Sequence, residues 1–372
     1  MIDPQTIYSI NSSVDVYKIG DDRLEFYFIT TRRRITMNVT PMVISLINDI
    51  DGETTIDQVC SMVGIDFEDE DVQAFLNYLL QKKILLIPAK DEERKKALSQ
   101  DDIDRYDRQL NYFNSLFEGS AYDSQKKLQN IKVLIFGAGA IGSGIAIQLA
   151  MAGVRHFSLV DKDIISEDSI ERHFYFRKED IGKSKVESLA DALKRIDNKV
   201  EYKTFHIIID YDTNLDKWLG DADFVINTMD EPYIGFTSMK IGRECYKLNL
   251  PLYVGGGFDA HLMSTGELIV PNVTPCVDCY TSYFTESLKD WQPKYNVEAV
   301  TDREYNDSIF EVGGLSSMAL FSVSYATIVI INYLITGDVL YSKGRGELLF
   351  DSLNINYLNV PRNPNCKICG KK

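Results

Sequence analysis

The sequence predicts an α/β protein: a doubly wound, mostly parallel sheet domain preceded by a small winged helix-turn-helix domain of the α+β class. From about residue 126 onward, apolar strand-like segments alternate with helical segments, and a glycine-rich turn follows the first of these strands. In residues 1–90, three segments rich in β-branched and aromatic residues precede three segments with helical periodicity. We therefore expect domains at 1–90 and 126–372, joined by a charged connector with a helix over 91–125.

Composition fits one or two globular domains, since 45% of the 372 residues are hydrophobic and 26% are charged. The net charge of −15 argues against a nucleic acid or a membrane as the main partner. The N-terminus has no signal-peptide pattern, and four of the six cysteines form two CxxC pairs, so we expect a cytoplasmic protein.

Val312–Gly337 is uncharged and long enough to cross a bilayer, but its Ser, Thr and Asn residues favour a helix buried in a core or subunit interface.

The first domain is expected to begin with strands and to continue with helices. The third helix places Val72, Phe75, Leu76, Leu79 and Leu80 on one face. The expected strands lie within 14–20, 23–31, 32–40 and 84–88, and the expected helices within 41–50, 54–64 and 69–83.

A winged helix-turn-helix suggests DNA binding, but residues 1–90 hold eight Lys/Arg against fourteen Asp/Glu, the opposite of a DNA reader. The run from Leu46 to Ile56, followed by a final helix and the strand KKILL, resembles the PqqD-like leader-recognition domains of enzymes that modify ribosomal peptides. The resemblance implies that a leader peptide adds a strand to an exposed sheet edge, for which we choose Arg34–Thr40. A structural or dimerising appendage is the alternative.

The nucleotide motif begins with an apolar strand, Lys132–Phe136, which runs into the turn Gly137-Ala-Gly139-Ala140-Ile-Gly142 and then into a helix. The glycines permit a tight turn, a close approach of the backbone to phosphate and close helix packing. Asp161 lies at the end of the next strand, where a carboxylate can bind ribose. This setting predicts a Rossmann-like nucleotide fold, but it does not separate NAD from ATP.

The following motifs resemble the adenylating family of ubiquitin-activating type, which includes the ThiF, MoeB and HesA proteins. Its D-x-D, S-N-L-x-R-Q and D-x-G-x-x-K signatures correspond to Asp161/Asp163, the run 168–173 and the run 180–185. Upstream, the run 105–109 matches R-Y-x-R-Q, and downstream Asp230 matches a strand-end aspartate. The resemblance covers roughly residues 103–372. The chain departs from the family pattern at two positions. Ser169 stands where the family has Asn, and His173 stands where the family has Gln.

The resemblance implies ATP and Mg²⁺ as cofactors and a role for each matching residue. Arg172 and Lys185 would clamp the phosphates, Asp230 would hold Mg²⁺, and Arg108 would reach ATP in the neighbouring subunit of a homodimer. The residues expected to contact the nucleotide are Gly137, Gly139, Ala140, Gly142, Asp161, Asp163 and Ser169.

Cys276-x-x-Cys279 and Cys366-x-x-Cys369 are two CxxC pairs, each expected in a hairpin. Four thiolates in such pairs are the usual ligands of a closed structural zinc site, and two disulfides are the alternative. The same family carries this site at these places.

The family's sulfur-transferring members keep a catalytic cysteine after the first CxxC pair, but Tyr280–Val312 contains none. A leader domain, an adenylating core and the missing cysteine resemble the peptide-modifying branch, typified by the enzymes that mature microcin C and form the pantocin core. The resemblance implies ATP-dependent adenylation of a carboxylate or carboxamide on a ribosomal precursor peptide, leading to modification or cyclisation without a thioester. The alternatives are a sulfur-carrier-protein adenylyltransferase and a non-catalytic protein that presents leader peptides.

Overall fold

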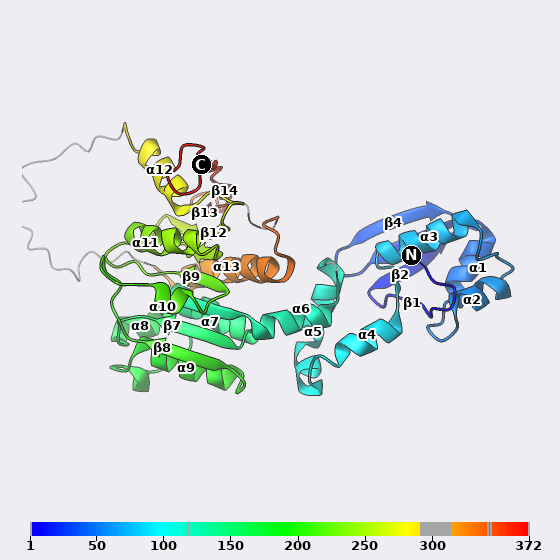
Figure 1. Cartoon of the computed structure of the whole chain (residues 1–372), viewed down its shortest axis with the longest axis horizontal. Helices are drawn as coiled ribbons and strands as arrows, with labels where there is room; N and C mark the ends of the chain where they lie inside the picture. The colour runs from blue at the N-terminus through cyan, green and yellow to red at the C-terminus, as the bar shows by residue number, and fades with distance from the viewer. Residues whose placement is uncertain (1, 118, 291–313, 341, 343, 371–372) are drawn as a thin grey trace, which may run out of the picture. The chain divides into compact units, whose positions relative to one another are not determined.

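A computed structural model describes residues 2–117, 119–290, 314–340, 342 and 344–370 (Figure 1). The chain forms two compact units, Met1–Lys126 and Lys127–Lys372.

The first unit contains the strands and helices predicted for residues 1–90. Strands β2, β3 and β4 form an antiparallel sheet in that order. The short strand β1 was not predicted from the sequence, and it pairs with β5 as a separate two-stranded sheet. The elements are β1 (Ser9–Ile10), β2 (Val14–Ile19), β3 (Arg23–Phe28), β4 (Arg33–Asn38), α1 (Pro41–Asp49), α2 (Ile56–Met62), α3 (Glu70–Gln81) and β5 (Leu85–Leu86).

Local chemistry sets the helix starts in this unit. Thr40 caps α1 by accepting a hydrogen bond from the Val43 N–H, and Pro41 occupies the first helical position. Asp69 caps α3 in the same way. The apolar faces of the helices meet the sheet in one core, in which Phe26, Leu46 and Leu76 are fully buried.

The connector region continues the first unit as helices. Helix α4 (Pro88–Lys95) precedes α5 (Gln100–Leu116), and α6 (Ala121–Asn130) contains the boundary between the two units. Arg108 lies on α5, where its side chain is exposed.

The second unit has the predicted doubly wound architecture. Its six-stranded sheet has the order β12-β10-β9-β6-β7-β8, parallel except for β12. The chain leaves β6 for β7 and β8 on one side and then returns to β9 and β10 on the other. The order therefore reverses at β6, and ligands of such folds bind at the carboxyl ends of the strands at this switch point.

Helices surround this sheet. Trp218 of α10 and Ile241 of α11 pack with strand residues in one buried hydrophobic cluster. Helix α7 packs against α9 and α13 (Figure 1). Elements of the first half are β6 (Lys132–Phe136), α7 (Ala140–Met151), β7 (His156–Val160), α8 (Glu167–Arg172), the 3₁₀ helix η1 (Lys178–Asp180), α9 (Lys185–Ile196), β8 (Glu201–Phe205), α10 (Asp216–Leu219) and β9 (Phe224–Asn227). Elements of the second half are α11 (Ile234–Lys247), β10 (Leu252–Val254), β11 (Leu262–Ser264), β12 (Glu267–Ile269), α12 (Val277–Ser287), α13 (Ser316–Thr336), β13 (Gly346–Leu349) and β14 (Ile355–Tyr357).

Helix α13 is the uncharged segment seen in the sequence. The helix is long and apolar enough to cross a membrane, but half of its most apolar stretch is buried inside the protein. It packs closely on α7, because a Cβ on Gly144 would lie 2.6 Å from a methyl group of Val323. One such helix is weak evidence for a span, since a buried core helix passes the same test.

Candidate functional site

The glycine-rich turn lies at the carboxyl end of β6, at the switch point of the sheet. Gly137 has φ +95°, a conformation that favours glycine, and a Cβ on Gly142 would lie 2.0 Å from the Gly137 carbonyl oxygen. A Cβ on Gly139 would meet nothing within 4 Å. The protein backbone therefore packs closely against the turn at Gly137 and Gly142, whereas Gly139, the residue before the first turn of α7, faces open space. An anion can approach the free N–H groups of that helix here.

Asp161 fixes this turn to the end of β7. Its carboxylate accepts hydrogen bonds from the Ala138 N–H (2.6 Å) and from the Asp163 N–H (2.8 Å). The side chain is 6% exposed, and this burial raises its pKa above the usual value. The two hydrogen bonds from backbone N–H groups oppose this shift, because they stabilise the charged carboxylate.

Lys185, at the start of α9, is held beside the same strand end. Its Nζ lies 2.8 Å from Asp163 Oδ2, and Lys162 Nζ lies 3.1 Å from Asp163 Oδ1. Burial would raise the pKa of Asp163, but the two lysines outweigh it and keep the pKa below the usual value. The Lys185 side chain is 14% exposed, so its charge acts in a largely desolvated setting.

Helix α8 carries the other predicted phosphate ligand. Arg172 pairs with Asp168 across one helical turn (3.2 Å) and is one-third exposed, so its guanidinium can reach a ligand. The Ser169 hydroxyl is engaged within the helix cap, 3.0 Å from Ser166 Oγ. Both of these side chains therefore have protein partners in the structure.

His173 is buried, and burial lowers its pKa to about 4, so the ring is neutral at physiological pH. Its Nδ1 lies 2.7 Å from the Ser169 carbonyl oxygen, which makes this nitrogen the N–H donor. Its Nε2 is buried and has no hydrogen-bond partner among the described residues. The ring also stacks on Phe176, with centroids 4.8 Å apart.

The end of β9 closes the site from the other side of the switch point. The Thr228 hydroxyl donates to the Gly137 carbonyl oxygen (3.0 Å) and thereby ties the two strand ends together. Asp230 follows two residues later and is exposed. Its neighbour Glu231 forms an ion pair with Lys162 (2.8 Å).

A cavity of about 420 Å³ opens beside Asp230, with Gly255, Gly256 and Gly257 along its wall. Its lining includes Glu267, which is 5% exposed, and Arg345, whose Nη1 lies 3.0 Å from Glu267 Oε1. Burial raises the pKa of Glu267, and the charge of Arg345 opposes that shift. The rest of the wall is largely apolar and aromatic, so the cavity combines an apolar surface with one buried ion pair.

The turn, the cations of Lys185 and Arg172, and the carboxylate of Asp230 supply what phosphoryl chemistry needs. Backbone N–H groups and positioned cations stabilise the charge that develops on phosphate oxygens. A carboxylate at a strand end can hold Mg²⁺ through oxygen ligands. The cavity beside Asp230 can hold the group that reacts with the nucleotide.

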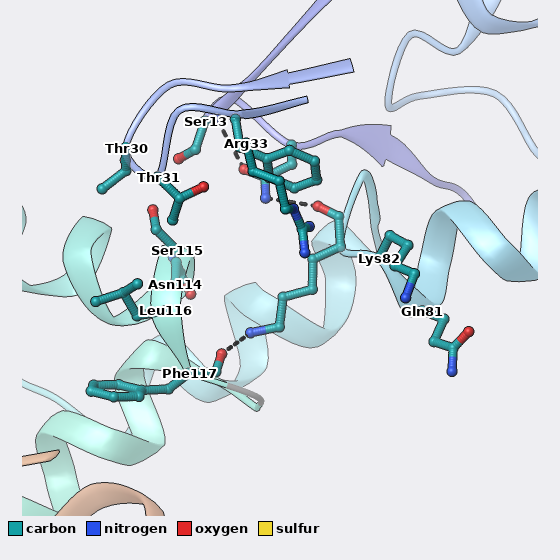
Figure 2. A pocket seen from close by; sticks show the side chains of 13 residues that line it. Ser13, Thr30, Thr31, Arg33, Gln81, Lys82, Asn114, Ser115, Leu116 and Phe117 are labelled. Atoms are coloured by element: carbon teal, nitrogen blue, oxygen red, sulfur yellow. Dashed lines mark hydrogen bonds between the residues drawn. The ribbon is translucent and has the colours of Figure 1, made fainter. Parts of the chain in front are cut away.

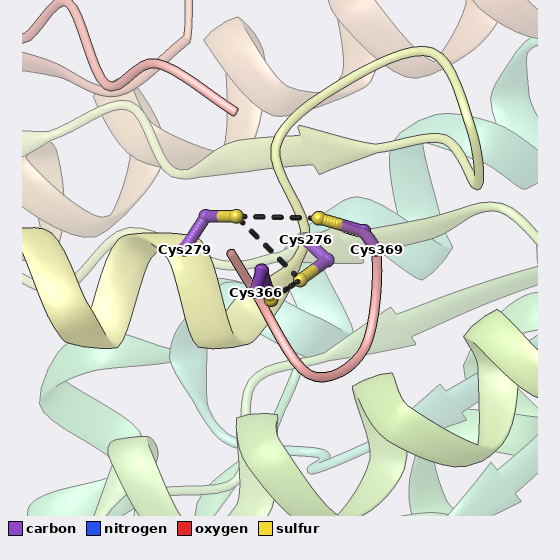
Figure 3. Close-up of side chains that lie close together, drawn as sticks. All are labelled: Cys276, Cys279, Cys366 and Cys369. Atoms are coloured by element: carbon purple, nitrogen blue, oxygen red, sulfur yellow. Dashed lines mark hydrogen bonds between the residues drawn. The ribbon is translucent and has the colours of Figure 1, made fainter. Parts of the chain in front are cut away.

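The four paired cysteines form one cluster (Figure 3). All four sulfurs lie within 4.8 Å of one another, and Sγ–Sγ distances of 3.3 Å (Cys279–Cys369), 3.5 Å (Cys276–Cys366) and 3.8 Å (Cys276–Cys279) are too long for disulfides. Tetrahedral zinc at about 2.3 Å from each sulfur would separate the sulfurs by roughly 3.8 Å, so the residues fit a zinc ion. The first pair lies at the start of α12, not in the predicted hairpin, with Cys276 as the N-cap.

The second pair is part of the C-terminal tail. A Cβ on Gly370 would lie 2.4 Å from the Cys366 carbonyl oxygen, so the turn requires glycine directly after the last cysteine. A bound ion would tie this tail to the start of α12, across the 86 residues that separate Cys279 from Cys366.

The other two thiols, Cys60 and Cys245, are buried. Burial raises the pKa of Cys60 to about 11 and that of Cys245, on α11, to about 12. Neither is a thiolate at physiological pH, so neither is a ready nucleophile. Most of the cysteine-free stretch Tyr280–Val312 falls outside the described residues.

The ThiF family model matches residues 106–367 of this chain. The chain belongs to the ThiF family. The predicted resemblance to this family is thereby confirmed, together with the Rossmann-like fold, and the chain is an ATP-dependent adenylyltransferase of the family.

Two curated ThiF-type relatives illustrate the match. The molybdopterin-synthase adenylyltransferase of Escherichia coli (strain K12) is 24% identical over 279 residues, which cover 74% of this chain and 99% of the relative. An adenylyltransferase and sulfurtransferase (MOCS3) of Caenorhabditis briggsae is 32% identical over half of this chain, and the match spans 44% of that longer protein.

Two solved structures share the fold of the whole chain. E. coli MccB, solved with ATP, superposes with a TM-score of 0.69 at 19% identity, covering 98% of this chain and 99% of MccB. PaaA gives a TM-score of 0.66 at 21% identity, covering 94% of this chain and 99% of PaaA. Both likenesses include the winged helix-turn-helix unit as well as the ThiF domain.

Sequence reasoning found the turn, the strand-end acids and the cysteines, but it missed the Glu267–Arg345 pair in the cavity. Glu267 lies next to apolar strand residues in TGELIV, whereas Arg345 lies between two glycines directly before β13. A carboxylate within an apolar strand is a signal of a buried ion pair, but nothing comparable in the sequence marks Arg345. The predicted residues Lys185 and Asp163 are in contact, as are Arg172 and Asp168. Arg108 belongs to the first unit, whereas the other predicted site residues belong to the second.

Proposed function

We propose that this ThiF-family chain adenylates a carboxylate or carboxamide of a ribosomally made precursor peptide, without a thioester intermediate. The observation that carries the proposal is the extent of the fold likeness. The E. coli molybdopterin-synthase adenylyltransferase leaves about a quarter of this chain unmatched, whereas MccB covers 98% of it, first unit included. MccB is a microcin C7 biosynthetic enzyme that has been solved with N-formylated MccA.

In the proposed reaction, an oxygen of the substrate attacks the α-phosphorus of ATP and pyrophosphate leaves. Gly137, Gly139, Ala140 and Gly142 would hold the phosphates, with Lys185 and Arg172 neutralising the charge that develops. Asp161, Asp163 and Ser169 would position the nucleotide. Asp230 would hold Mg²⁺, and the adjacent cavity would hold the reacting end of the peptide. A zinc ion on the four cysteines would serve structure only.

We further propose that the enzyme works as a cytoplasmic homodimer, in which Arg108 reaches the nucleotide of the neighbouring subunit. The absence of any cysteine between Cys279 and Cys366 supports direct use of the adenylate, because a transferable acyl group has no thiol to receive it there.

The leader of the precursor would pair with the outer edge of β4. The Val39 N–H donates to the Asp22 carbonyl oxygen (2.8 Å), so in the antiparallel register the odd-numbered residues of β4 bond to β3. The N–H and C=O groups of Arg34, Thr36 and Asn38 therefore face outward. In the described part of the first unit, no strand pairs with them. An extended peptide can use these groups by strand addition.

Thr36→Pro tests this leader site, because it removes one outward N–H and leaves the β3 pairing intact. We expect the affinity for the precursor to fall about five- to tenfold, the value of one or two hydrogen bonds, while the affinity for ATP stays unchanged. Thr36→Val is the matched control, since it keeps the N–H. Calorimetric titration of the full chain measures both affinities, and equal precursor binding by both variants would contradict the proposed edge.

A sulfur-carrier adenylyltransferase is the second candidate, favoured by the match to the whole length of the molybdopterin-synthase enzyme. Such an enzyme would use a carrier protein and would need no leader edge. A protein that only presents leaders is the third candidate. The retention of Lys185, Arg172 and Asp230 around the turn argues against it.

A further inference from the structure

A second cavity, of about 240 Å³, lies wholly within the first unit, at the start of β4 (Figure 2). The turn between β3 and β4 supplies Thr30 and Thr31, and β4 itself supplies Arg33. Asn11 and Ser13, which precede β2, Phe28 of β3 and the ends of α3 and α5 form the remaining walls, and Phe117 lies where α5 stops. The cavity therefore lies at the end of the sheet where β4, the strand proposed to pair with the leader, begins.

The charge of this cavity is opposite to that of the domain around it. Its described lining contains Arg33, Lys82 and Lys83 and no acidic residue, although residues 1–90 carry a net negative charge. Hydroxyl and amide groups make up most of the other lining side chains. Lys83 donates to the Phe117 carbonyl oxygen, so its ammonium stabilises the end of α5. The cations available to a ligand are thus Arg33 and Lys82.

Arg33 is held in place without an ion pair among the described residues. Its guanidinium carbon lies 4.1 Å from the centroid of the Phe28 ring, which orients the group by a cation–π contact. Lys82 lies over Tyr78 in a similar way, at 5.5 Å. Both charges keep their N–H donors for an anion, and a guanidinium binds a carboxylate with two parallel hydrogen bonds.

The pleat of β4 places Arg33 in line with two apolar residues. Side chains alternate between the two faces of a strand, so Arg33, Ile35 and Met37 share one face. Ile35 and Met37 pack against the hydrophobic core that α3 also joins. A strand added to β4 would direct every second side chain toward this same face. It would meet apolar surface beside Met37 and Ile35 and then the cations at Arg33.

We propose that this cavity binds an acidic side chain of the leader peptide and thereby sets the register of strand addition. The recognised pattern is an Asp or Glu in the same alternating series as one or two apolar residues, spaced by two positions. Main-chain pairing along β4 is indifferent to sequence, so this charge contact would select the leader. The inference rests on the proposed function, because it needs a peptide on the edge of β4.

A selection experiment tests the proposal without knowledge of the precursor. A display library of random nine-residue peptides is panned on the full-length chain, and the enriched peptides are sequenced. We expect Asp or Glu to be enriched at one position, two or four residues from an enriched apolar position. Arg33→Gln should abolish the acidic enrichment and weaken individual selected peptides about tenfold at low salt, with a smaller loss at high salt. Arg32→Gln is the matched control, because Arg32 lies in the same turn but does not line the cavity.

The outcomes separate this inference from the proposed function. Peptides that depend on Thr36 but show no acidic preference, or that bind the Arg33→Gln variant equally well, would overturn the acidic site and leave the leader edge standing. A selection that yields no peptide sensitive to Thr36→Pro would overturn the leader edge itself. Acidic enrichment lost equally in Arg32→Gln and Arg33→Gln would indicate general charge attraction and would also overturn the site.

Discussion

Lys185→Ala should reduce precursor-dependent ATP–pyrophosphate exchange by about 10²–10³-fold, the usual cost of removing one positioned charge from a transition state. The Lys185 ammonium is largely buried, 2.8 Å from Asp163, at the strand end that faces the glycine-rich turn. Among the described residues, Lys185 is the cation paired with Asp163 Oδ2, whereas Lys162 pairs with Oδ1. Asp230→Asn should cause a loss of the same order, because the amide holds Mg²⁺ more weakly than the carboxylate does.

Lys203→Ala is the control for this prediction, since Lys203 is exposed on β8 and pairs with Asp221 at the surface. It should keep full exchange activity, because exposed ion pairs contribute little. Circular dichroism and thermal melting of all three variants show whether the fold is intact. Exchange within about threefold of the unchanged protein in folded Lys185→Ala would show that the phosphate site lies elsewhere.

Loss of the metal should release the C-terminal tail and lower the stability of the second unit. Elemental analysis of the purified protein should find about one zinc per chain. Cys366→Ser should lose this zinc and lower Tm by roughly 10 °C or more, because a structural zinc ion supplies several kcal/mol of folding free energy. Outside the cluster, Arg362 holds the tail to the rest of the unit by donating to the Asn272 carbonyl oxygen (2.6 Å).

Cys60→Ala is the control for the metal, because Cys60 lies in the first unit and takes no part in the cluster. That variant should keep its zinc, although the lost sulfur leaves a small core cavity. A metal-free protein with an unchanged Tm, or mass spectra that show two disulfides among the four cysteines, would contradict the zinc site.

The sequence predicted the parts of the molecule whose signals are local. The apolar strand Lys132–Phe136 and the turn after it could be placed because glycine spacing and strand composition lie within a dozen residues. The same holds for the third helix of the first unit, whose apolar periodicity and capping Asp69 are continuous in the chain. Strand β1 was missed because two residues carry no periodicity, and because its partners in β5 lie 75 and 77 residues away (Ile10 with Leu85, Ser9 with Leu86).

Features that depend on distant segments could not be predicted in this way. Glu267 and Arg345 are separated by 78 residues, and only the fold places them in one cavity. The cation-lined cavity of the first unit likewise combines a hairpin turn with the ends of α3 and α5. Ser169 and His173 depart from the family pattern in sequence, and the structure shows why that matters locally: the hydroxyl serves the cap of α8, and the imidazole is neutral and buried.

We propose that this ThiF-family enzyme activates a precursor peptide held by its first unit. The most direct measurement is ATP–pyrophosphate exchange by the full chain with Mg²⁺ and each of two substrates: a ribosomal precursor peptide and a small carrier protein ending in Gly-Gly. We predict that only the peptide supports exchange, and that Thr36→Pro raises the peptide concentration needed for half-maximal exchange without lowering the maximal rate. Exchange supported by the Gly-Gly carrier alone, and unaffected by Thr36→Pro, would contradict the account and identify a sulfur-carrier adenylyltransferase.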